Sequence, residues 1–401
     1  MDLRMFENAT MGELVEISGA DRFLGRWDHH AFVPCPLGDQ EPALSGATYR
    51  AIAAAGRALA ALDANARQLP SPSLLRIPAL RREAQSTSAL EGTYAPLDEV
   101  LTADEDSPAT VEMTEILNYV SMAEAGFTWV QEGRPLTIGL IENLQGLLMR
   151  GTALEGESGR LRTTQVVIGR RDGAAPGAAP IHASRFVPVP PGDRLRAGVT
   201  ALVDWLRQDH SGAIDPVVVA GMAHYQFETL HPFRDGNGRL GRYLIVLTLL
   251  GSGMLSEPTL TVSPWFEARR TEYYDALLGV STRGDWDAFL TFFAQGLEAA
   301  AVSTREQMLV LAGVQHELRE MIRSSPLRSA QAPALVDFAV AHPSFTVRRV
   351  QEALGLSYGR ANSLVGQLVD LGVLQPIDPD AHPRRFTAPR VLRALLSGGL
   401  G

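Results

Sequence analysis

The sequence predicts a mainly α-helical protein with one β-hairpin inserted between helices and a small separate module at the C-terminus. Apolar residues recur at helical spacing over most of the chain. Two short β-rich runs between residues 163 and 188 flank a loop dense in Gly, Ala and Pro, as in a hairpin. Residues 327–401 contain eight Arg and five acidic residues in a chain of net charge −9. A length of 401 residues allows two or three domains, and these features place them at 1–110, 111–323 and 327–401.

The first 110 residues form a predicted helical region behind an irregular start. Prolines and a glycine between 34 and 38 predict that residues 1–45 are irregular. An alanine-rich helix follows over 45–67, and the segment LPSPSLL (69–75) breaks it. A second helix begins near Pro78, because proline is tolerated in a first helical turn. Gly92 is placed to cap that helix.

The central region alternates helices with the hairpin. An amphipathic helix is expected over 136–150, followed by strands at 163–168 and 185–188. Asp215-Pro216 predicts the start of the next helix, since Asp is a favoured N-cap and Pro a favoured first residue. A last core helix is expected after Gly284.

The segment HPFRDGNGRLGR (231–242) is the most informative stretch of the chain. Gly236 and Gly238 surround one residue, which favours left-handed backbone and close approach of a ligand. The apolar residues that follow have helical spacing, so the glycine turn lies at a helix N-terminus. The unsatisfied N–H groups and the positive end of the helix dipole there form an anion site.

The charged side chains of this segment suit the same site. Arg239 and Arg242 are three residues apart, and each guanidinium can bind phosphate oxygens with two hydrogen bonds. Asp235 is a hard oxygen ligand for Mg²⁺ shared with a polyphosphate. His231 is the nearby group that accepts a proton near neutral pH. The segment therefore predicts a phosphate site with a base beside it.

This segment resembles the signature of Fic domain proteins at every position of the motif. The resemblance implies a helical-bundle core that moves AMP from ATP to a hydroxyl side chain of a target protein and releases pyrophosphate. It implies that His231 deprotonates the target hydroxyl and that Asp235 holds Mg²⁺ between the α- and β-phosphates. It also implies that Arg239 contacts the triphosphate and that Arg242 orients the γ-phosphate.

The resemblance assigns further residues to the nucleotide. Asn237, with the backbone of Gly236 and Gly238, would line the anion hole at the α-phosphate. Tyr273 or Tyr274 would form a wall of the adenine pocket, although aromatic residues at helical spacing are also common in a core.

A second motif, Thr87-Ser-Ala-Leu-Glu91-Gly92, resembles the inhibitory motif of Fic proteins whose inhibitory helix is N-terminal. The implied mechanism is competition, in which Glu91 pairs with Arg242 where the γ-phosphate would bind. Glu91 would also be placed to position water for removal of AMP. By itself the pattern fits a capped helix with a surface glutamate better.

The predicted hairpin resembles the flap of Fic proteins, which pairs with an extended segment of the target protein by strand addition. Arg162, Ile168 and Phe186 are candidates for holding it in place. An ordinary surface hairpin is the alternative.

The C-terminal segment has the pattern of a winged helix-turn-helix domain. Helices are expected over 333–341 and 346–354, then a turn at Gly355, a helix capped by Ser357, a hairpin and a last helix from Pro389. DNA is one candidate partner of residues 327–401, and a dimerisation or docking module is the alternative.

In the DNA interpretation, one group of side chains would face the major groove and two arginines would contact phosphates. The first group is Tyr358, Arg360, Asn362 and Ser363, and the two arginines are Arg384 and Arg385.

Composition excludes several classes of chemistry. All 36 basic residues are Arg, so the lysine that a P-loop, a protein kinase or a Schiff base needs is absent. Cys35, the single cysteine, excludes an internal disulfide and a thiolate metal cluster. His224, Glu228 and His231 lack the order of a zinc motif, so His224 is read as a packed core residue.

The remaining expectations concern setting and alternative functions. No apolar segment reaches membrane-spanning length, so we expect a cytoplasmic protein without membrane attachment. Arginine-only, alanine-rich usage suggests a bacterial genome rich in GC. Three other functions stay open, namely a nucleotide-sensing DNA-binding regulator, removal of AMP, and transfer of another phosphate group by the same core. A homodimer is a further expectation from the resemblance.

Overall fold

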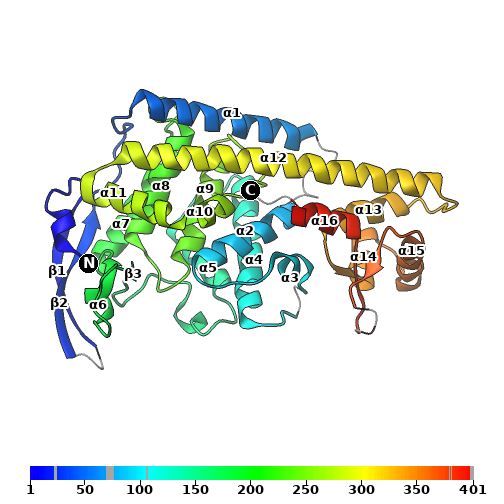
Figure 1. The fold of residues 1–401 in the computed structure, drawn as a ribbon, viewed down its shortest axis with the longest axis horizontal. Coiled ribbons are helices and arrows are strands. Elements are labelled where there is room, and N and C mark those ends of the chain that lie inside the picture. Colours follow the sequence, from blue (N-terminus) through cyan, green and yellow to red (C-terminus); the bar gives the residue numbers. More distant parts are fainter. Residues whose placement is uncertain (22–24, 69–75, 105–106, 379, 381, 398–401) are drawn as a thin grey trace. The chain divides into compact units, whose positions relative to one another are not determined.

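The computed structural model describes residues 1–401 except 22–24, 69–75, 105–106, 379, 381 and 398–401, and it is mostly helical (Figure 1). The longer helices are α1 (Gly46–Gln68), α2 (Arg76–Leu90), α4 (Val111–Gln131), α5 (Ile138–Leu148), α7 (Asp193–Leu206), α8 (Pro216–Leu230), α9 (Asn237–Gly251), α11 (Arg270–Arg283), α12 (Trp286–Ser324), α13 (Ala332–Ala341), α14 (Val347–Leu354), α15 (Tyr358–Asp370) and α16 (Pro389–Ser397). The short helices are η1 (Leu3–Phe6), α3 (Leu97–Thr102), η3 (Glu155–Glu157), α6 (Pro180–Ala183) and α10 (Ser263–Ala268). The strands are β1 (Gly12–Asp21), β2 (Gly25–Pro34), β3 (Ile168–Arg170), β4 (Ser184–Phe186), β5 (Phe345–Thr346), β6 (Gln375–Pro376) and β7 (Arg385–Thr387).

The chain divides into two compact units. The first unit contains residues 1–57, 121–254 and 268–298, and the second contains 58–120, 255–267 and 299–401. The three-part division expected from the sequence stays a prediction. The helix break expected at 69–75 lies outside the described residues. Among the residues described, none of the helices is long and apolar enough to cross a membrane.

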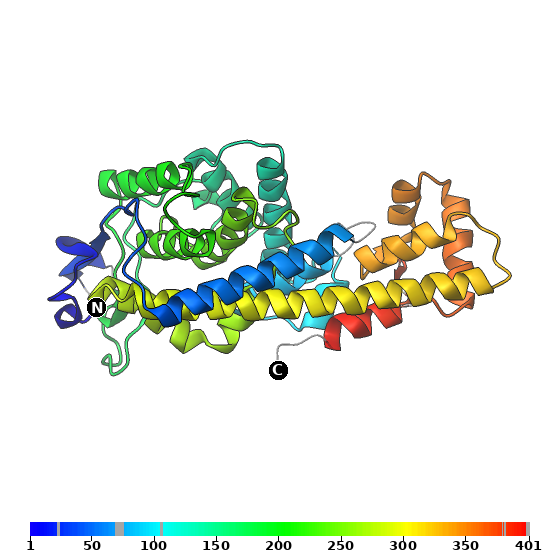
Figure 2. The same ribbon diagram turned by 90° about the horizontal axis from the view of Figure 1, so that it is seen from above.

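Helices α8 and α9 form the centre of the first unit. Almost every residue of both helices is buried, so neither has a solvent face. Helix α8 begins as predicted, with the Asp215 carboxylate accepting a hydrogen bond from the Val217 N–H at 2.8 Å and Pro216 in the first turn. The green helices α7, α8 and α9 pack side by side in both views (Figures 1 and 2). The signature segment lies between α8 and α9.

Part of the N-terminal segment is regular, contrary to the sequence prediction, whereas residues 35–45 form neither helix nor strand, as predicted. Strands β1 and β2 pair antiparallel along ten residues each, from Gly12 opposite Pro34 to Asp21 opposite Gly25. The prolines and glycine that suggested irregular chain lie at the end of β2 or beyond it, so they end the hairpin instead of preventing it. The Phe32 N–H donates to the Val187 carbonyl at 2.9 Å and joins β2 to the segment after β4.

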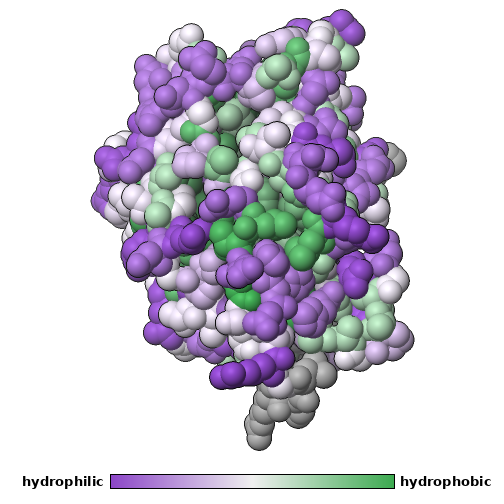
Figure 3. Space-filling model, turned by 90° about the vertical axis from the view of Figure 1, so that its left-hand side faces the viewer, coloured by the Kyte–Doolittle hydropathy of each residue, from purple (hydrophilic) through white to green (hydrophobic). Residues whose placement is uncertain are grey.

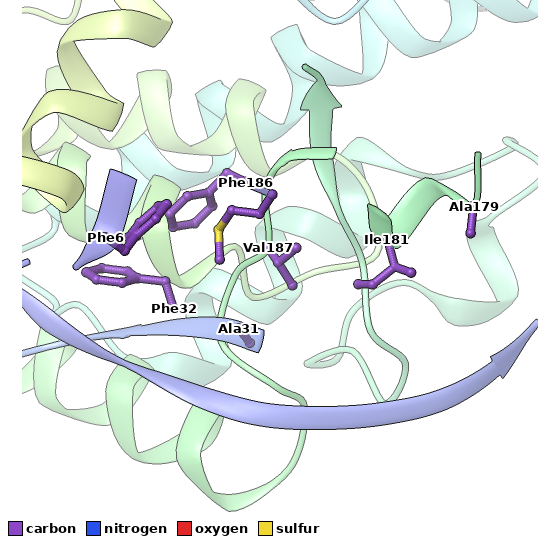
Figure 4. Packing of buried hydrophobic residues seen from close by; sticks show 8 residues of the cluster. Phe6, Ala31, Phe32, Ala179, Ile181, Phe186 and Val187 are labelled. Atoms are coloured by element: carbon purple, nitrogen blue, oxygen red, sulfur yellow. The ribbon is translucent and has the colours of Figure 1, made fainter. Parts of the chain in front are cut away.

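A buried apolar cluster anchors this hairpin in the first unit (Figure 4). Three rings form its centre, with centroid distances of 5.4 Å between Phe6 and Phe32, 6.1 Å between Phe6 and Phe186, and 5.8 Å between Phe32 and Phe186. The rings come from η1, β2 and β4, which are far apart in sequence. Figure 3 shows that hydrophobic side chains also reach the surface on this side of the molecule, surrounded by hydrophilic ones.

The predicted hairpin of the central region is present but shorter and shifted. Ile168 pairs with Phe186 and Arg170 with Ser184, whereas residues 163–167 are outside the strands. Proline residues in the opposite segment lack the N–H that a ladder requires. The Gln165 side chain compensates, since its Nε2 donates to the Pro188 carbonyl at 2.9 Å.

The second unit contains the C-terminal helices in the predicted order. Helix α14 ends at Gly355, which has φ 63°, and the Ser357 side chain caps α15 by accepting from the Arg360 N–H. A three-stranded sheet with the order β5-β7-β6 accompanies them. Strand β5 was not predicted, because two residues give no periodicity. The winged-helix assignment of this segment stays a prediction.

Candidate active site

The loop from His231 to Gly236 connects α8 to α9, and left-handed backbone marks both of its ends. His231 has φ 49° and ψ 61°, the one positive φ of a non-glycine residue in the described part of the chain. Gly236 has φ 80°, and a β-carbon there would lie 2.8 Å from Cδ2 of Leu148. A left-handed histidine at a helix end is held by its surroundings, and such backbone clusters at functional sites.

The Asn237 side chain closes this loop. Its Oδ1 accepts from the Phe233 backbone N–H at 2.8 Å, and its Nδ2 donates to the Phe233 carbonyl at 2.8 Å. The Phe233 ring is fully buried and lies 6.5 Å from the Phe227 ring, measured between centroids. These contacts fix the loop against the start of α9, whose first N–H groups lack partners within the helix.

Two side chains from distant segments hold the loop from outside. The Gln145 Nε2 donates to the Asp235 carbonyl at 3.1 Å, and its Oε1 accepts from the Gly159 N–H at 2.6 Å. The Arg162 Nε donates to the His231 carbonyl at 2.8 Å, while the Arg162 backbone N–H donates to the Pro232 carbonyl at 2.9 Å.

Arg162 therefore neutralises the carbonyl end of α8, beyond its predicted role at the hairpin. Its guanidinium also donates to the carbonyls of Val189 and Leu230. Burial lowers the pKa of Arg162 to about 10, so the side chain stays charged at neutral pH. The roles of Gln145 and Arg162 were missed, because their partners are 69 to 90 residues away and no local pattern signals them.

Asp235 and Arg239 form an ion pair at the mouth of the loop. The Arg239 Nη2 lies 3.4 Å from the Asp235 Oδ1, and the same oxygen accepts from the Gly236 N–H at 2.6 Å. The Arg239 side chain is 2% exposed, whereas that of Asp235 is 46% exposed. The carboxylate is thus fixed through one oxygen and faces solvent.

The donor set around Asp235 fits a magnesium ion held jointly with a substrate. Within the described ranges, no group of three or more His, Cys, Asp or Glu side chains is placed to hold a metal. Mg²⁺ commonly takes one or two carboxylates and completes its shell with phosphates and water. One half-exposed carboxylate beside an anion site matches that mode.

Arg242 belongs to a buried hydrogen-bond network with Tyr273 and His224. Arg242 is 0% exposed, and its side chain hydrogen bonds to the Tyr273 hydroxyl. The His224 Nε2 lies 2.7 Å from that hydroxyl, and its Nδ1 lies 3.0 Å from the carbonyl of Gly241. A carbonyl only accepts, so Nδ1 carries the proton and Nε2 accepts from Tyr273.

Burial keeps this network at a single positive charge. It lowers the pKa of His224 to about 3 and raises the pKa of Tyr273 well above its usual value, so both are neutral near pH 7. The reading of His224 as a packed core residue is confirmed. Tyr273 is 1% exposed and positions Arg242, whereas Tyr274 is partly exposed. Their place in an adenine pocket stays a prediction.

The His231 ring is oriented for proton transfer. Its Nδ1 lies 3.3 Å from the Glu228 carbonyl, which assigns the ring proton to Nδ1 and the acceptor lone pair to Nε2. The ring is only partly buried. His231 and Asp235 thus lie on the loop, and Arg239 and Arg242 lie in the first two turns of α9. Their joint role in a site stays a prediction.

The β3–β4 hairpin is tied to the first unit on both sides. Phe186 of β4 enters the aromatic cluster, and its register partner is Ile168, as expected of the residues that hold the hairpin. Arg185 forms an ion pair with Asp275 of α11.

The motif of Thr87 and Glu91 lies at the end of α2, in the second unit. Thr87 is 0% exposed. Gly92 has φ 95° and its N–H donates to the Ala89 carbonyl at 3.1 Å, which confirms the predicted cap. Glu91 occupies the capping turn. Its pairing with Arg242 stays a prediction.

Two stretches of the chain match known protein families. Residues 49–128 match the Fic/DOC family N-terminal region, and residues 135–249 match the Fic/DOC family. These two stretches of the chain are therefore similar to the two regions of Fic/DOC proteins. The match of the second stretch includes the signature loop and the β3–β4 hairpin.

Curated relatives share part of the chain. It is 36% identical over 150 residues to protein adenylyltransferase fic-1 of Caenorhabditis elegans, covering 37% of this chain and 25% of that protein. It is 34% identical over 142 residues to protein adenylyltransferase Fic of Culex quinquefasciatus, covering 35% and 24%. The chain therefore spans about a quarter of the length of these relatives.

A solved structure extends the likeness of fold over most of the chain. A Fic family protein from Desulfovibrio desulfuricans G20 superposes with a TM-score of 0.53 at 24% identity, covering 86% of this chain and 97% of that one.

Proposed function

We propose that this chain is a protein adenylyltransferase that moves AMP from ATP to a hydroxyl side chain of a target protein. The observation that carries the proposal is the left-handed His231, whose Nε2 accepts protons beside a helix N-terminus carrying two buried arginines. The names of the curated relatives support it.

In the proposed reaction, the target hydroxyl oxygen attacks the α-phosphorus and His231 Nε2 takes its proton. The bond from the α-phosphorus to the bridging oxygen breaks, and pyrophosphate leaves with the electron pair. Backbone N–H groups at the start of α9 bind the α-phosphate, because the Asn237 amide is engaged with Phe233. Arg239 and Arg242 bind the rest of the triphosphate.

Mg²⁺ held by Asp235 would neutralise phosphate charge and keep the pyrophosphate in line. The ion pair with Arg239 and the Gly236 N–H orient the Asp235 carboxylate before the metal binds.

We further propose that Glu91 inhibits the reaction by pairing with Arg242 in place of the γ-phosphate. A hydrogen bond to a charged group contributes about 1.5–3 kcal/mol, so this competition would weaken productive ATP binding roughly ten- to 150-fold. The capped turn of Gly92 supports the proposal, because it fixes the backbone that carries Glu91.

The flap is the proposed site of target binding. Strands β3 and β4 are short and anchored at their base, which suits the addition of an extended segment to a free edge.

ATP labelled at the α-phosphate tests the transferase proposal. The variant Glu91→Ala is expected to label itself or proteins of an added extract, and Glu91→Ala with His231→Ala is expected to lose the label. ATP labelled at the γ-phosphate should label nothing. Equal α-label with and without His231, or γ-label alone, would reject adenylyl transfer.

A further inference from the structure

A cavity lies within the second unit, outside the signature loop. Its volume is about 600 Å³. Residues of α2, the segment after α3, the start of α14, the first turns of α15 and strand β7 line it. Ligand pockets for small molecules range from about 300 to 1,000 Å³. The cavity is thus of a size to hold a nucleotide.

The lining of this cavity is strongly basic. Its charged side chains are five arginines and a single aspartate, and they are Arg81, Arg348, Arg349, Arg384, Arg385 and Asp104. Helix α14 begins in the lining with Thr346 as its N-cap, so the positive end of its dipole adds to the arginines. This combination selects an anion with several oxygens, such as a phosphate.

Part of this charge is already used within the fold. The Arg81 Nη1 donates to the carbonyls of Val100, Leu101 and Ala103, and the Arg385 Nη1 donates to the Thr102 carbonyl at 2.6 Å. These two arginines cap the carbonyl end of α3 and shape the cavity wall.

The outer arginines are more accessible. The Arg348 Nε lies 3.2 Å from the Glu352 carboxylate with its side chain 81% exposed, and Arg384 is exposed. They are the groups available to a ligand.

The cavity also offers aromatic surface. Phe345 and Phe386 stack with centroids 6.5 Å apart, and Tyr358 at the start of α15 is 58% exposed. An exposed aromatic ring next to a phosphate site suits a base, since any base can stack on it.

The same cavity is lined by residues expected to face DNA. Tyr358, Asn362 and Arg384 line it together with Asp104 and Ser107. Binding of duplex DNA by these residues is therefore an outcome that the experiment must distinguish.

We propose that this cavity binds a nucleoside phosphate, with the phosphates on Arg348 and Arg384 and the base on Tyr358. Arg81 of α2 forms part of the cavity wall, so a bound nucleotide is expected to restrain the helix that precedes Glu91 through this wall.

Titration of the full chain with ADP, followed by calorimetry, tests the proposal. Arg384→Ala and Arg348→Ala are each expected to weaken ADP binding about two- to fivefold, as for exposed charges. Tyr358→Ala should weaken ADP binding and leave pyrophosphate binding unchanged. Arg360→Ala is the matched control, because Arg360 is exposed on α15 and lies outside the cavity lining.

A second measurement follows hydrogen exchange in α2. At an ADP concentration near the Kd of the wild type, ADP is expected to slow exchange there in the wild type and in Arg242→Ala, and to slow it less in Arg384→Ala. Neither measurement requires transfer of AMP, so failure here is distinct from failure of the proposed function.

Three results would overturn the inference. The first is ADP binding that Arg242→Ala abolishes and Arg384→Ala leaves intact, which places the nucleotide at the signature loop alone. The second is pyrophosphate binding as tight as ADP binding, which would mean that the nucleoside contributes nothing to binding. The third is a shift of duplex DNA that both Arg360→Ala and Arg384→Ala weaken, which makes the surface a DNA site.

Discussion

Arg239 in the signature segment keeps 2% of its side chain exposed, whereas Arg348 in the cavity of the second unit keeps 81%. The buried arginines of the signature are held by neighbouring side chains, among them Asp235 and Tyr273. The exposed arginines of the cavity, Arg348 and Arg384, are surrounded mainly by solvent. A charge fixed before binding loses little entropy when phosphate arrives, and burial protects it from salt. We therefore expect the buried arginines of the signature to bind phosphate with little dependence on salt, and the exposed arginines of the cavity to bind it more weakly and with a clear dependence on salt.

Loss of the base is the largest expected effect on the buried site. In a Glu91→Ala background, His231→Ala should lower the rate of α-label incorporation by about 10²–10⁴, the usual contribution of general base catalysis. The control is His316→Ala, since His316 is exposed on α12. Comparable losses in both variants would contradict a specific role for His231.

Release of inhibition is the next largest. Glu91→Ala should raise α-label incorporation roughly ten- to 150-fold, because Arg242 becomes available to the γ-phosphate. Glu99→Ala, at an exposed position of α3, should change nothing. An unchanged rate in Glu91→Ala would reject the competition.

Removal of one hydroxyl tests whether buried partners hold Arg242. Tyr273→Phe should lower the free energy of unfolding by about 1–3 kcal/mol, because His224 and Arg242 lose a buried partner. The KM for ATP should rise more than kcat falls. Tyr274→Phe, partly exposed, is the control for urea unfolding and kinetics. Equal effects of the two substitutions would mean that the Tyr273 hydroxyl has no specific role in holding Arg242.

The pH dependence of stability probes the same network. The pKa of His224 is about 3 in the fold and 6.5 as its ordinary value, so the unfolded chain binds the extra proton first. Stability is expected to fall as pH drops from about 6.5 toward 3, with His224 adding at most about 1.4 kcal/mol per pH unit. The free energy of unfolding, measured with urea at several pH values, should change less steeply with pH for His224→Gln than for His316→Gln. Identical slopes would mean that His224 is charged in the fold.

The smallest expected effect is that of salt on ADP binding, which should distinguish the exposed arginines of the cavity from the buried arginines of the signature. Raising NaCl from about 50 to 300 mM is expected to weaken ADP binding at the cavity by a few fold, since exposed charges are screened. In Arg348→Ala this salt dependence should be reduced, as calorimetry will detect. Salt dependence unaltered by Arg348→Ala would assign the binding to other groups.

Local patterns predicted the elements that rest on local interactions. The start of α8 at Asp215-Pro216, the Gly92 cap and the α14–α15 turn follow from capping chemistry and periodicity within a few residues. The β1–β2 hairpin was missed, because prolines near its end resembled loop signals. The length of the flap strands was misjudged, because it depends on prolines in the opposite segment.

The sequence by itself determined the resemblance to Fic proteins, the helical class and the signature motif, because those features are encoded in contiguous spacing. The tertiary structure decided how the signature is held. The clamps of Gln145 and Arg162, the Arg242–Tyr273–His224 network and the arginine-lined cavity join residues far apart in the chain. A side chain's partners across such separations are set by packing, and no local pattern specifies packing.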